Sequence, residues 1–510
     1  MAENIKKETS LTTRAFWLMF AKTLGFAFAF ALPPLLVRRL TQTEYGLFKQ
    51  IFLVVGTAVM VLPLGFGMSA YYFLPREDAR RRAQVVFNII IFSALVGAAG
   101  GLALILLPGL LLGHVFNDAT LVEYGPLVGV VVFFWVVSSF LEMVAVANEE
   151  TRVSTVLIIC AQLTKALFML AALFAFGTLR SLVIASLVQG VLQTIILLGY
   201  LRSRFPGFWR GFEWGMMRTQ LAYAMPLGLA GLLYTVQADL HNYFVSHRFS
   251  AAEFAVYSVG CFQLPLVGLL RESANSVMIT RVSLLQKEGE TREIIELMAR
   301  VMRKLAVFFF PIYAFLMVTG REFIAFLFTP AYLSSWPIFA LYLTVLPFFI
   351  VIFDPLVRAY SEHRYFLLKV RTAMFFVLIA GLWFGVARFG LLGAVGTVVV
   401  ISVAERLALL AKFGRVLEVS RRDLLLLRDV GKVAVAAVAA AAVAALVRAF
   451  MPGVKPFFVL AACGVAFGLA YVGGLLLLKV VTEDEFDAVR ERAARLRRRV
   501  YWTRAEDPLS

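Results

Sequence analysis

Long apolar segments recur along the chain from Ala15 to Val480, separated by short stretches in which charged residues, glycine and proline gather. A helix needs about 20 predominantly apolar residues to cross the hydrocarbon core of a bilayer. The pattern therefore predicts an all-α, polytopic membrane protein with about 14 transmembrane helices. The predicted spans are 15–37, 45–74, 84–107, 125–147, 153–176, 180–201, 219–245, 252–278, 303–320, 335–359, 366–387, 390–413, 432–450 and 456–480.

The composition excludes most other classes of protein. Of the 510 residues, 61% are hydrophobic and only 16% are charged, whereas soluble proteins have about 45–50% apolar and about 25% charged residues. A disordered chain, a disulfide scaffold and, despite the net charge of +17, a nucleic-acid-binding protein are excluded. Cys160, Cys261 and Cys463 each lie inside an apolar segment, so we interpret them as small buried hydrophobic residues.

The basic residues are distributed unevenly between the loops. Lysine and arginine gather in the cytoplasmic loops of membrane proteins. With a cytoplasmic N-terminus, the predicted cytoplasmic segments contain 37 of the 49 Lys and Arg residues and the opposite loops contain 8. We therefore predict a multi-pass protein with both termini in the cytoplasm, and we attribute most of the net charge to topology. The extracytoplasmic loops near 108–124 and 321–334 are too short for a catalytic domain.

Two segments of the chain repeat at a nearly constant offset. Arg39–Phe48 aligns with Arg248–Tyr257 at an offset of 209 residues, and His114–Phe116 aligns with Phe326–Phe328 at an offset of 212. Because an even number of predicted helices separates the repeats, both halves enter the membrane with the same polarity. Parallel repeats of this kind are related by an axis along the membrane normal, with the substrate path between them.

The repeat predicts the domain organisation. Two parallel six-helix lobes occupy 1–201 and 219–414, and 202–218 is a cytoplasmic linker that is either a plain connection or a moving hinge. Two extra C-terminal helices occupy 432–480. The tail at 481–510 carries an apolar stripe among many arginines. It is either an amphipathic helix on the anionic inner leaflet or a basic tail that only fixes topology.

Four basic residues lie within predicted spans and outside these loop counts: Lys22, Lys49, Lys165 and Arg271. A charge at the centre of a membrane helix costs about 2.5–3.5 kcal/mol. Lys165 lies deepest, about 18 Å from the start of its predicted helix at 1.5 Å per residue. The charges indicate a wet, cationic surface between the halves. The alternatives are snorkelling to an interface or pairing with a carboxylate on another helix.

Polar residues accompany these cations. Gln162 lies one turn before Lys165, and Gln189 and Gln193 share one face of the next predicted helix. Asp239 and His241, near the outer end of the seventh predicted helix, form a possible proton-coupling site. No phosphate-binding loop, zinc motif or nucleophile elbow occurs, so we predict no catalytic residue, metal or cofactor.

Four motifs are similar to those of a known family: Pro34–Phe48, Tyr223–Ala230, Phe254–Gly260 and Phe326–Tyr332. The chain resembles the polysaccharide-transporter (Wzx-type flippase) family of the multidrug/oligosaccharidyl-lipid/polysaccharide (MOP) exporter superfamily. The resemblance implies a non-enzymatic flippase of the bacterial inner membrane. Such proteins move undecaprenyl-pyrophosphate-linked oligosaccharide from the cytoplasmic to the periplasmic leaflet, through two six-helix lobes around a cationic cavity.

The resemblance also implies roles for the buried polar residues. Lys165, Arg271 and Lys22 would bind the pyrophosphate, with Lys49 as a further candidate. The sugar hydroxyls would meet Gln162, Gln189 and Gln193. Implied partners are membrane lipids, a polysaccharide polymerase and a chain-length regulator. Two other functions stay open: a cation-coupled multidrug exporter of the same superfamily, and an integral-membrane glycan polymerase or glycosyltransferase.

Overall fold

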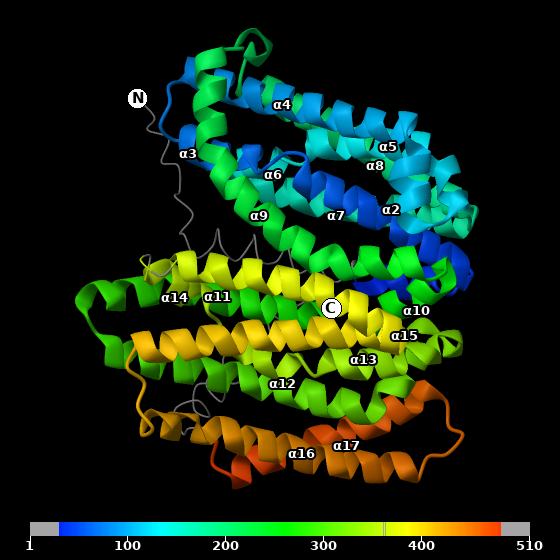
Figure 1. The fold of residues 1–510 in the computed structure, drawn as a ribbon, viewed down its shortest axis with the longest axis vertical. Coiled ribbons are helices and arrows are strands. Elements are labelled where there is room, and N and C mark those ends of the chain that lie inside the picture. Colours follow the sequence, from blue (N-terminus) through cyan, green and yellow to red (C-terminus); the bar gives the residue numbers. More distant parts are fainter. Residues whose placement is uncertain (1–29, 361, 363, 481–510) are drawn as a thin grey trace, which may run out of the picture. The chain divides into compact units, whose positions relative to one another are not determined.

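The computed structural model describes residues 30–480 apart from 361 and 363, and it is helical throughout that part of the chain (Figure 1). No β-strand occurs among these residues, which confirms the predicted all-α class. Lys22 and the tail at 481–510 lie outside the described residues, so the predictions for them stay predictions.

The helices differ widely in length. The α-helices are α2 (Gln42–Val61), α3 (Ser69–Phe73), α4 (Ala79–Leu106), α5 (Gly125–Ser138), α6 (Leu141–Ala147), α7 (Thr151–Ala175), α8 (Leu179–Arg204), α9 (Trp214–Arg248), α10 (Ala251–Gly260), α11 (Pro265–Glu288), α12 (Thr291–Phe328), α13 (Trp336–Leu343), α14 (Asp354–Ala359), α15 (Arg364–Val416), α16 (Arg428–Ala449) and α17 (Pro456–Leu477). Short 3₁₀ or π segments between them include η4 (Phe208–Arg210), η5 (Pro330–Ser335), η6 (Leu346–Ile350) and η8 (Asp423–Leu427).

Many of these helices are long and apolar enough to cross a bilayer. The described part of the chain contains nine such helices, or eleven if each of two bent pairs counts as one span. A multi-pass membrane protein is therefore confirmed, whereas the count of 14 spans stays a prediction. One reason for the difference is that α15, treated as one helix, contains both predicted spans at 366–387 and 390–413 and reverses at Gly390.

Two local predictions from the sequence are wrong. A loop was expected at 321–334, but α12 continues to Phe328. Within these charged residues, Glu322 accepts a hydrogen bond from Arg448 Nε at 2.9 Å. The predicted continuous span at 335–359 is instead divided into α13, η6 and α14. Pro347 and Pro355 stand at the starts of η6 and α14 and lack the N–H that a continuing helix needs.

The chain divides into two compact units. The first contains Met1–Leu269, Leu327–Tyr342 and Leu368–Ile401, and the second contains Leu270–Phe326, Leu343–Leu367 and Ser402–Ser510. The predicted lobes at 1–201 and 219–414 and the linker at 202–218 stay predictions.

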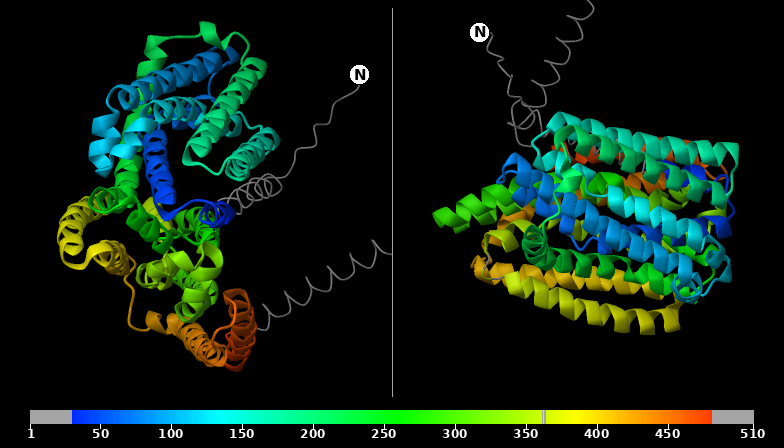
Figure 2. Two further views of the ribbon diagram at one scale, coloured as in Figure 1. Left: turned by 90° about the vertical axis from the view of Figure 1, so that its right-hand side faces the viewer. Right: turned by 90° about the horizontal axis from the view of Figure 1, so that it is seen from above.

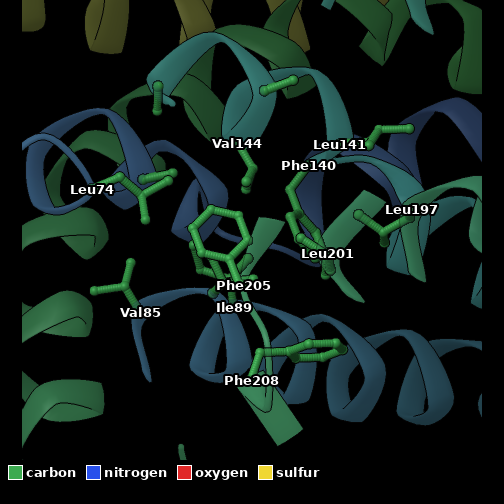
Figure 3. Packing of buried hydrophobic residues seen from close by; sticks show 14 of the residues in the cluster. Leu74, Val85, Ile89, Phe140, Leu141, Val144, Leu197, Leu201, Phe205 and Phe208 are labelled. Atoms are coloured by element: carbon green, nitrogen blue, oxygen red, sulfur yellow. The ribbon is translucent and has the colours of Figure 1, made fainter. Parts of the chain in front are cut away.

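A hydrophobic cluster at one end of the first unit joins α3, α4, α6, α8 and α9. Two aromatic residues of the predicted linker, Phe205 and Phe208, are buried in it. Phe205 lies close to Phe140 and Ile89 in Figure 3. The segment after α8 is therefore anchored in the core of the first unit through these two rings.

The aligned repeats adopt the same local structure. Thr41 caps α2 and Ser250 caps α10, and in each case the hydroxyl and the backbone N–H hydrogen-bond to the glutamate three residues later. The hydroxyl-to-carboxylate distances are 2.9 Å for Thr41–Glu44 and 2.8 Å for Ser250–Glu253. A capping box satisfies backbone donors at a helix start. The offset of 209 residues therefore relates two equivalent helix starts.

In the second unit, α16 and α17 form a hairpin (Figures 1 and 2). The hairpin is attached to α12 at two levels. Arg448 of α16 pairs with Glu322 at 2.9 Å, and the hydroxyl of Tyr471 on α17 donates to the carbonyl oxygen of Val307 at 2.9 Å. Both contacts satisfy polar groups inside apolar helices, where an unsatisfied group is expensive.

Candidate functional site

Lys165 of α7 lies over the indole ring of Trp135 on α5. Its ammonium nitrogen is 4.7 Å from the ring centroid, which is the geometry of a cation–π contact. Trp135 Nε1 donates to the carbonyl oxygen of Ser186 on α8 at 2.9 Å, which fixes the ring orientation. Gly190 makes room for the ring, because a Cβ at that position would lie 2.7 Å from Trp135 Cδ1. The position of the ring beneath Lys165 is therefore imposed by α8.

The charge of Lys165 is not neutralised within the described part of the chain. No carboxylate pairs with its ammonium there, and no hydrogen bond to it occurs. A desolvated cation–π contact contributes about 2 kcal/mol, less than the about 2.5–3.5 kcal/mol cost of a charge at the centre of a membrane helix. Lys165 lies in the middle part of the 25-residue α7. Its charge is thus available to an external anion.

The structure brings Gln189 next to the same part of α7. The buried Gln189 side chain donates through Nε2 to the carbonyl oxygen of Ala161 at 3.2 Å, one turn before Lys165. Its Oε1 atom has no hydrogen-bond partner among the described residues. Gln193 accepts from Ser138 Oγ at 3.5 Å, the outer limit of a hydrogen bond. Gln162 shares α7 with Lys165 and is half-buried.

Lys49 belongs to the same aromatic environment. Its ammonium is 5.7 Å from the ring centroid of Tyr45, one turn earlier on α2. Phe52, one turn after Lys49, has its ring centroid 6.2 Å from that of Trp135. Phe48 links the two rings of α2, because its ring centroid is 6.3 Å from that of Tyr45 and 4.5 Å from that of Phe52. We call Tyr45, Phe48, Lys49, Phe52, Trp135 and Lys165 the cation–aromatic cluster. It collects two cations from α2 and α7 around one run of aromatic rings inside the first unit.

Arg271 lies in the second unit. Its guanidinium carbon is 4.3 Å from the ring centroid of Phe349, and that of Arg406 is 4.5 Å from the same centroid. Asn275, one turn after Arg271, donates to Asp354 Oδ2 at 3.3 Å. Arg271 therefore lies with a second arginine around one phenylalanine, in a unit other than that of Lys165.

Asp239 and His241 form hydrogen bonds with different residues. His241 is buried, and its Nδ1 atom hydrogen-bonds with the hydroxyl of Tyr257 at 2.8 Å. Asp239 hydrogen-bonds with Asn242 of its own helix. Positions two apart on a helix point about 200° away from each other. The proton-coupling role stays a prediction, and each residue would act in its own surroundings.

A family model described as "Polysaccharide biosynthesis protein" matches residues 35–337. The chain belongs to this polysaccharide biosynthesis protein family. Among curated proteins, none matches the sequence.

Solved transporter structures share the fold. The lipid II flippase MurJ, in an inward closed conformation, is 14% identical with a TM-score of 0.69, and the match covers 92% of this chain and 98% of MurJ. An inward-facing multidrug resistance MATE family transporter of the MOP superfamily is 13% identical with a TM-score of 0.58, covering 83% and 97%. A mutant of the Vibrio cholerae MATE transporter VcmN is 16% identical with a TM-score of 0.54, covering 81% and 98%. This member of the polysaccharide biosynthesis family thus has the fold of MOP-superfamily transporters.

Sequence reasoning about this family member missed three residues of the candidate site. Trp135 is an ordinary apolar residue of a predicted span, and only its contact with Lys165 distinguishes it. Arg406, near the end of the predicted span 390–413, was not singled out, and it lies within α15 beside Phe349. Gln50, next to Lys49, is fully buried, and neither of its side-chain polar atoms has a hydrogen-bond partner in the described residues. In the sequence, the position of Gln50 directly after the intramembrane Lys49 was the one feature that could have drawn attention to it.

Proposed function

We propose that this protein flips an oligosaccharide linked to undecaprenyl pyrophosphate from the cytoplasmic to the periplasmic leaflet of the bacterial inner membrane. The product feeds the assembly of a cell-surface polysaccharide such as O-antigen, capsule or exopolysaccharide. Membership of the polysaccharide biosynthesis family and the fold shared with the lipid II flippase MurJ support the proposal. A polysaccharide polymerase and a chain-length regulator are the proposed partners.

The observation that carries the proposal is the position of Lys165. Its charge lies in an apolar helix and has no carboxylate partner in the described residues. Pyrophosphate is a permanent anion, and lysine binds phosphate as a point charge. Lys49, on the same run of aromatic rings, supplies a second positive charge. Lys22 and Arg271 are the further proposed ligands of the pyrophosphate.

The glutamines suit the sugar part of the substrate. An amide offers both donors and an acceptor, which matches sugar hydroxyls. The Oε1 atom of Gln189 is buried and has no hydrogen-bond partner in the described residues, so it can accept a hydrogen bond from a sugar hydroxyl. Gln193 and Gln162 extend the polar lining along α8 and α7. We propose that the three side chains orient the sugar nearest the pyrophosphate.

The transport step follows from alternating access. The two lobes rock about the bound headgroup while the lipid tail remains in the bilayer. An inside-negative potential favours outward movement of an anion by about 2.3 kcal/mol per charge per 100 mV. The potential thus gives the transport its direction without ATP hydrolysis by this chain.

Multidrug export is the second candidate, because MATE transporters share the fold. The charges of the cation–aromatic cluster are positive and would repel cationic drugs. A lipid-linked anion is the better match to these charges. The glycan polymerase or glycosyltransferase is the weaker alternative, because the predicted extracytoplasmic loops are too short for a catalytic domain.

Reconstitution into liposomes tests the proposal. A fluorescent undecaprenyl-pyrophosphate-linked oligosaccharide is placed in both leaflets, and its accessibility to a membrane-impermeant quencher measures flipping. We expect flipping with the wild type, strong loss with Lys165→Ala and wild-type rates with Lys287→Ala, which removes an exposed charge at the end of α11. Wild-type flipping by Lys165→Ala would refute the role of Lys165, and absence of flipping by the wild type would refute the function.

A further inference from the structure

The two halves of α15 form an apolar groove of about 480 Å³. The halves run side by side on either side of the reversal at Gly390 (Figure 2). All of the lining residues belong to α15 and to the first unit: Val377, Gly381, Phe384, Gly385, Phe389, Leu392, Gly393, Gly396, Thr397, Val400 and Ile401. Val377, Phe384 and Val400 are each more than half exposed, so the groove opens on the outside of the unit.

Glycines bring the two halves close together and form the base of the groove. The backbones at Gly385 and Gly393 approach so closely that a Cβ at Gly385 would lie 2.9 Å from the Gly393 carbonyl oxygen. The only hydroxyl in the lining, that of Thr397, already donates to the Gly381 carbonyl oxygen at 3.0 Å and to the Gly393 carbonyl oxygen at 2.8 Å. The groove therefore presents carbon atoms and suits a hydrocarbon chain, not a polar solute.

One cation lies at the end of the hairpin where the chain reverses, and a second lies against the half of α15 that precedes the reversal. Arg388 is exposed and follows Phe384 by one turn, so it lies on the face that lines the groove. The guanidinium of Arg248 lies 5.7 Å from the ring centroid of Trp383, the residue before Phe384. In the described part of the chain, no carboxylate pairs with either arginine. The end of the groove at Arg388 is therefore electropositive, and Arg248 adds a second positive charge beside the same half of α15.

We propose that the groove binds one acyl chain of an anionic phospholipid, with the phosphate beside Arg388 and Arg248. The helix α15 is long and apolar enough to lie in the membrane, where the surrounding solvent is hydrocarbon. From Phe389 to Val377 the groove extends about 18 Å along the helix at 1.5 Å per residue. Basic residues beside an apolar surface attract anionic headgroups. The site is separate from the cation–aromatic cluster and does not depend on the proposed substrate.

Native mass spectrometry of the full-length protein in detergent tests the site. The protein is titrated with dioleoyl phosphatidylglycerol, with the zwitterionic dioleoyl phosphatidylethanolamine and with undecaprenyl phosphate. Val400→Trp fills the groove, and Val438→Trp places the same side chain on α16 at a position equally exposed to lipid. Arg388→Gln removes one cation, and Arg321→Gln removes an exposed cation of α12 as its control.

We expect one tightly bound phosphatidylglycerol that is lost in Val400→Trp and kept in Val438→Trp. Arg388→Gln should weaken phosphatidylglycerol binding about fivefold, the effect of one basic residue beside an anionic headgroup. It should leave phosphatidylethanolamine binding unchanged, and Arg321→Gln should change neither. Wild-type phosphatidylglycerol binding by a monodisperse Val400→Trp protein would overturn the proposal. Preferential binding of undecaprenyl phosphate would also overturn it, because the occupant would then be a polyprenyl chain.

Discussion

Gly190 of α8 lies against the ring of Trp135 so closely that any β-carbon at this position would displace the indole. The distance from such a carbon to Trp135 Cδ1 would be 2.7 Å. The indole is also held by its 2.9 Å hydrogen bond to the Ser186 carbonyl oxygen. The position of the Trp135 ring beneath Lys165 therefore depends on the absence of a side chain at Gly190 of α8.

The first prediction concerns this glycine. Gly190→Ala should displace the Trp135 ring and with it the ammonium of Lys165. We expect flipping in liposomes to fall about tenfold, as for a loss of about 1.4 kcal/mol in substrate binding. Gly199→Ala on the same helix is the control, because nothing lies within 4 Å of a Cβ there. Equal flipping by the two variants would show that the ring position is unimportant.

The second prediction separates stability from function at Lys165. A central charge costs about 2.5–3.5 kcal/mol, and the contact with Trp135 offsets about 2 kcal/mol of this. Lys165→Met should therefore stabilise the protein by about 1 kcal/mol while abolishing flipping. Thermal unfolding in detergent measures the first effect. A lower unfolding temperature for the methionine variant would indicate that the lysine has a structural role.

The third prediction concerns the ion pair between Arg448 and Glu322. The Arg448 side chain is 35% exposed and that of Glu322 is 18% exposed, so solvent screens the pair only in part. Glu322→Ala leaves the Arg448 guanidinium without its carboxylate and should destabilise the protein by about 1–3 kcal/mol. The double variant Glu322→Leu with Arg448→Met should be closer to wild type, because it leaves no charge unpaired. Thermal unfolding of the single and the double variant measures the two changes in stability. Equal destabilisation of both variants would contradict the expected cost of the unpaired Arg448.

The fourth prediction concerns the reversal of α15. Gly390 has φ of 59° and ψ of −137°, a region that is essentially restricted to glycine. Nothing lies within 4 Å of a Cβ there, so Gly390→Ala tests backbone strain alone. We expect a destabilisation of about 1–3 kcal/mol. Gly468→Ala, in α17 and with equally open surroundings, should be neutral or slightly stabilising. A neutral Gly390→Ala would contradict the strain.

Much of the fold was accessible from the sequence because the bilayer constrains it strongly. Apolar segments of span length predicted an all-α membrane protein, and the repeat at Arg39 and Arg248 identified two equivalent helix starts. The breaks were harder to predict. The prediction of a continuous span at 335–359 did not take into account that Pro347 and Pro355 interrupt the helix. Near the end of α12, Glu322 pairs with Arg448, 126 residues away, a contact that no local pattern reveals.

The sequence by itself determined that the chain is helical, lies in a membrane and contains isolated basic residues in apolar segments. Hydrophobicity and charge are properties of each residue, so their distribution is visible without coordinates. Only the tertiary structure decided which groups surround those charges. Trp135 approaches Lys165, and Arg406 joins Arg271 at Phe349, because separate helices pack against one another. Such contacts depend on the relative position and rotation of helices, and helical periodicity within one segment carries no information about its neighbours.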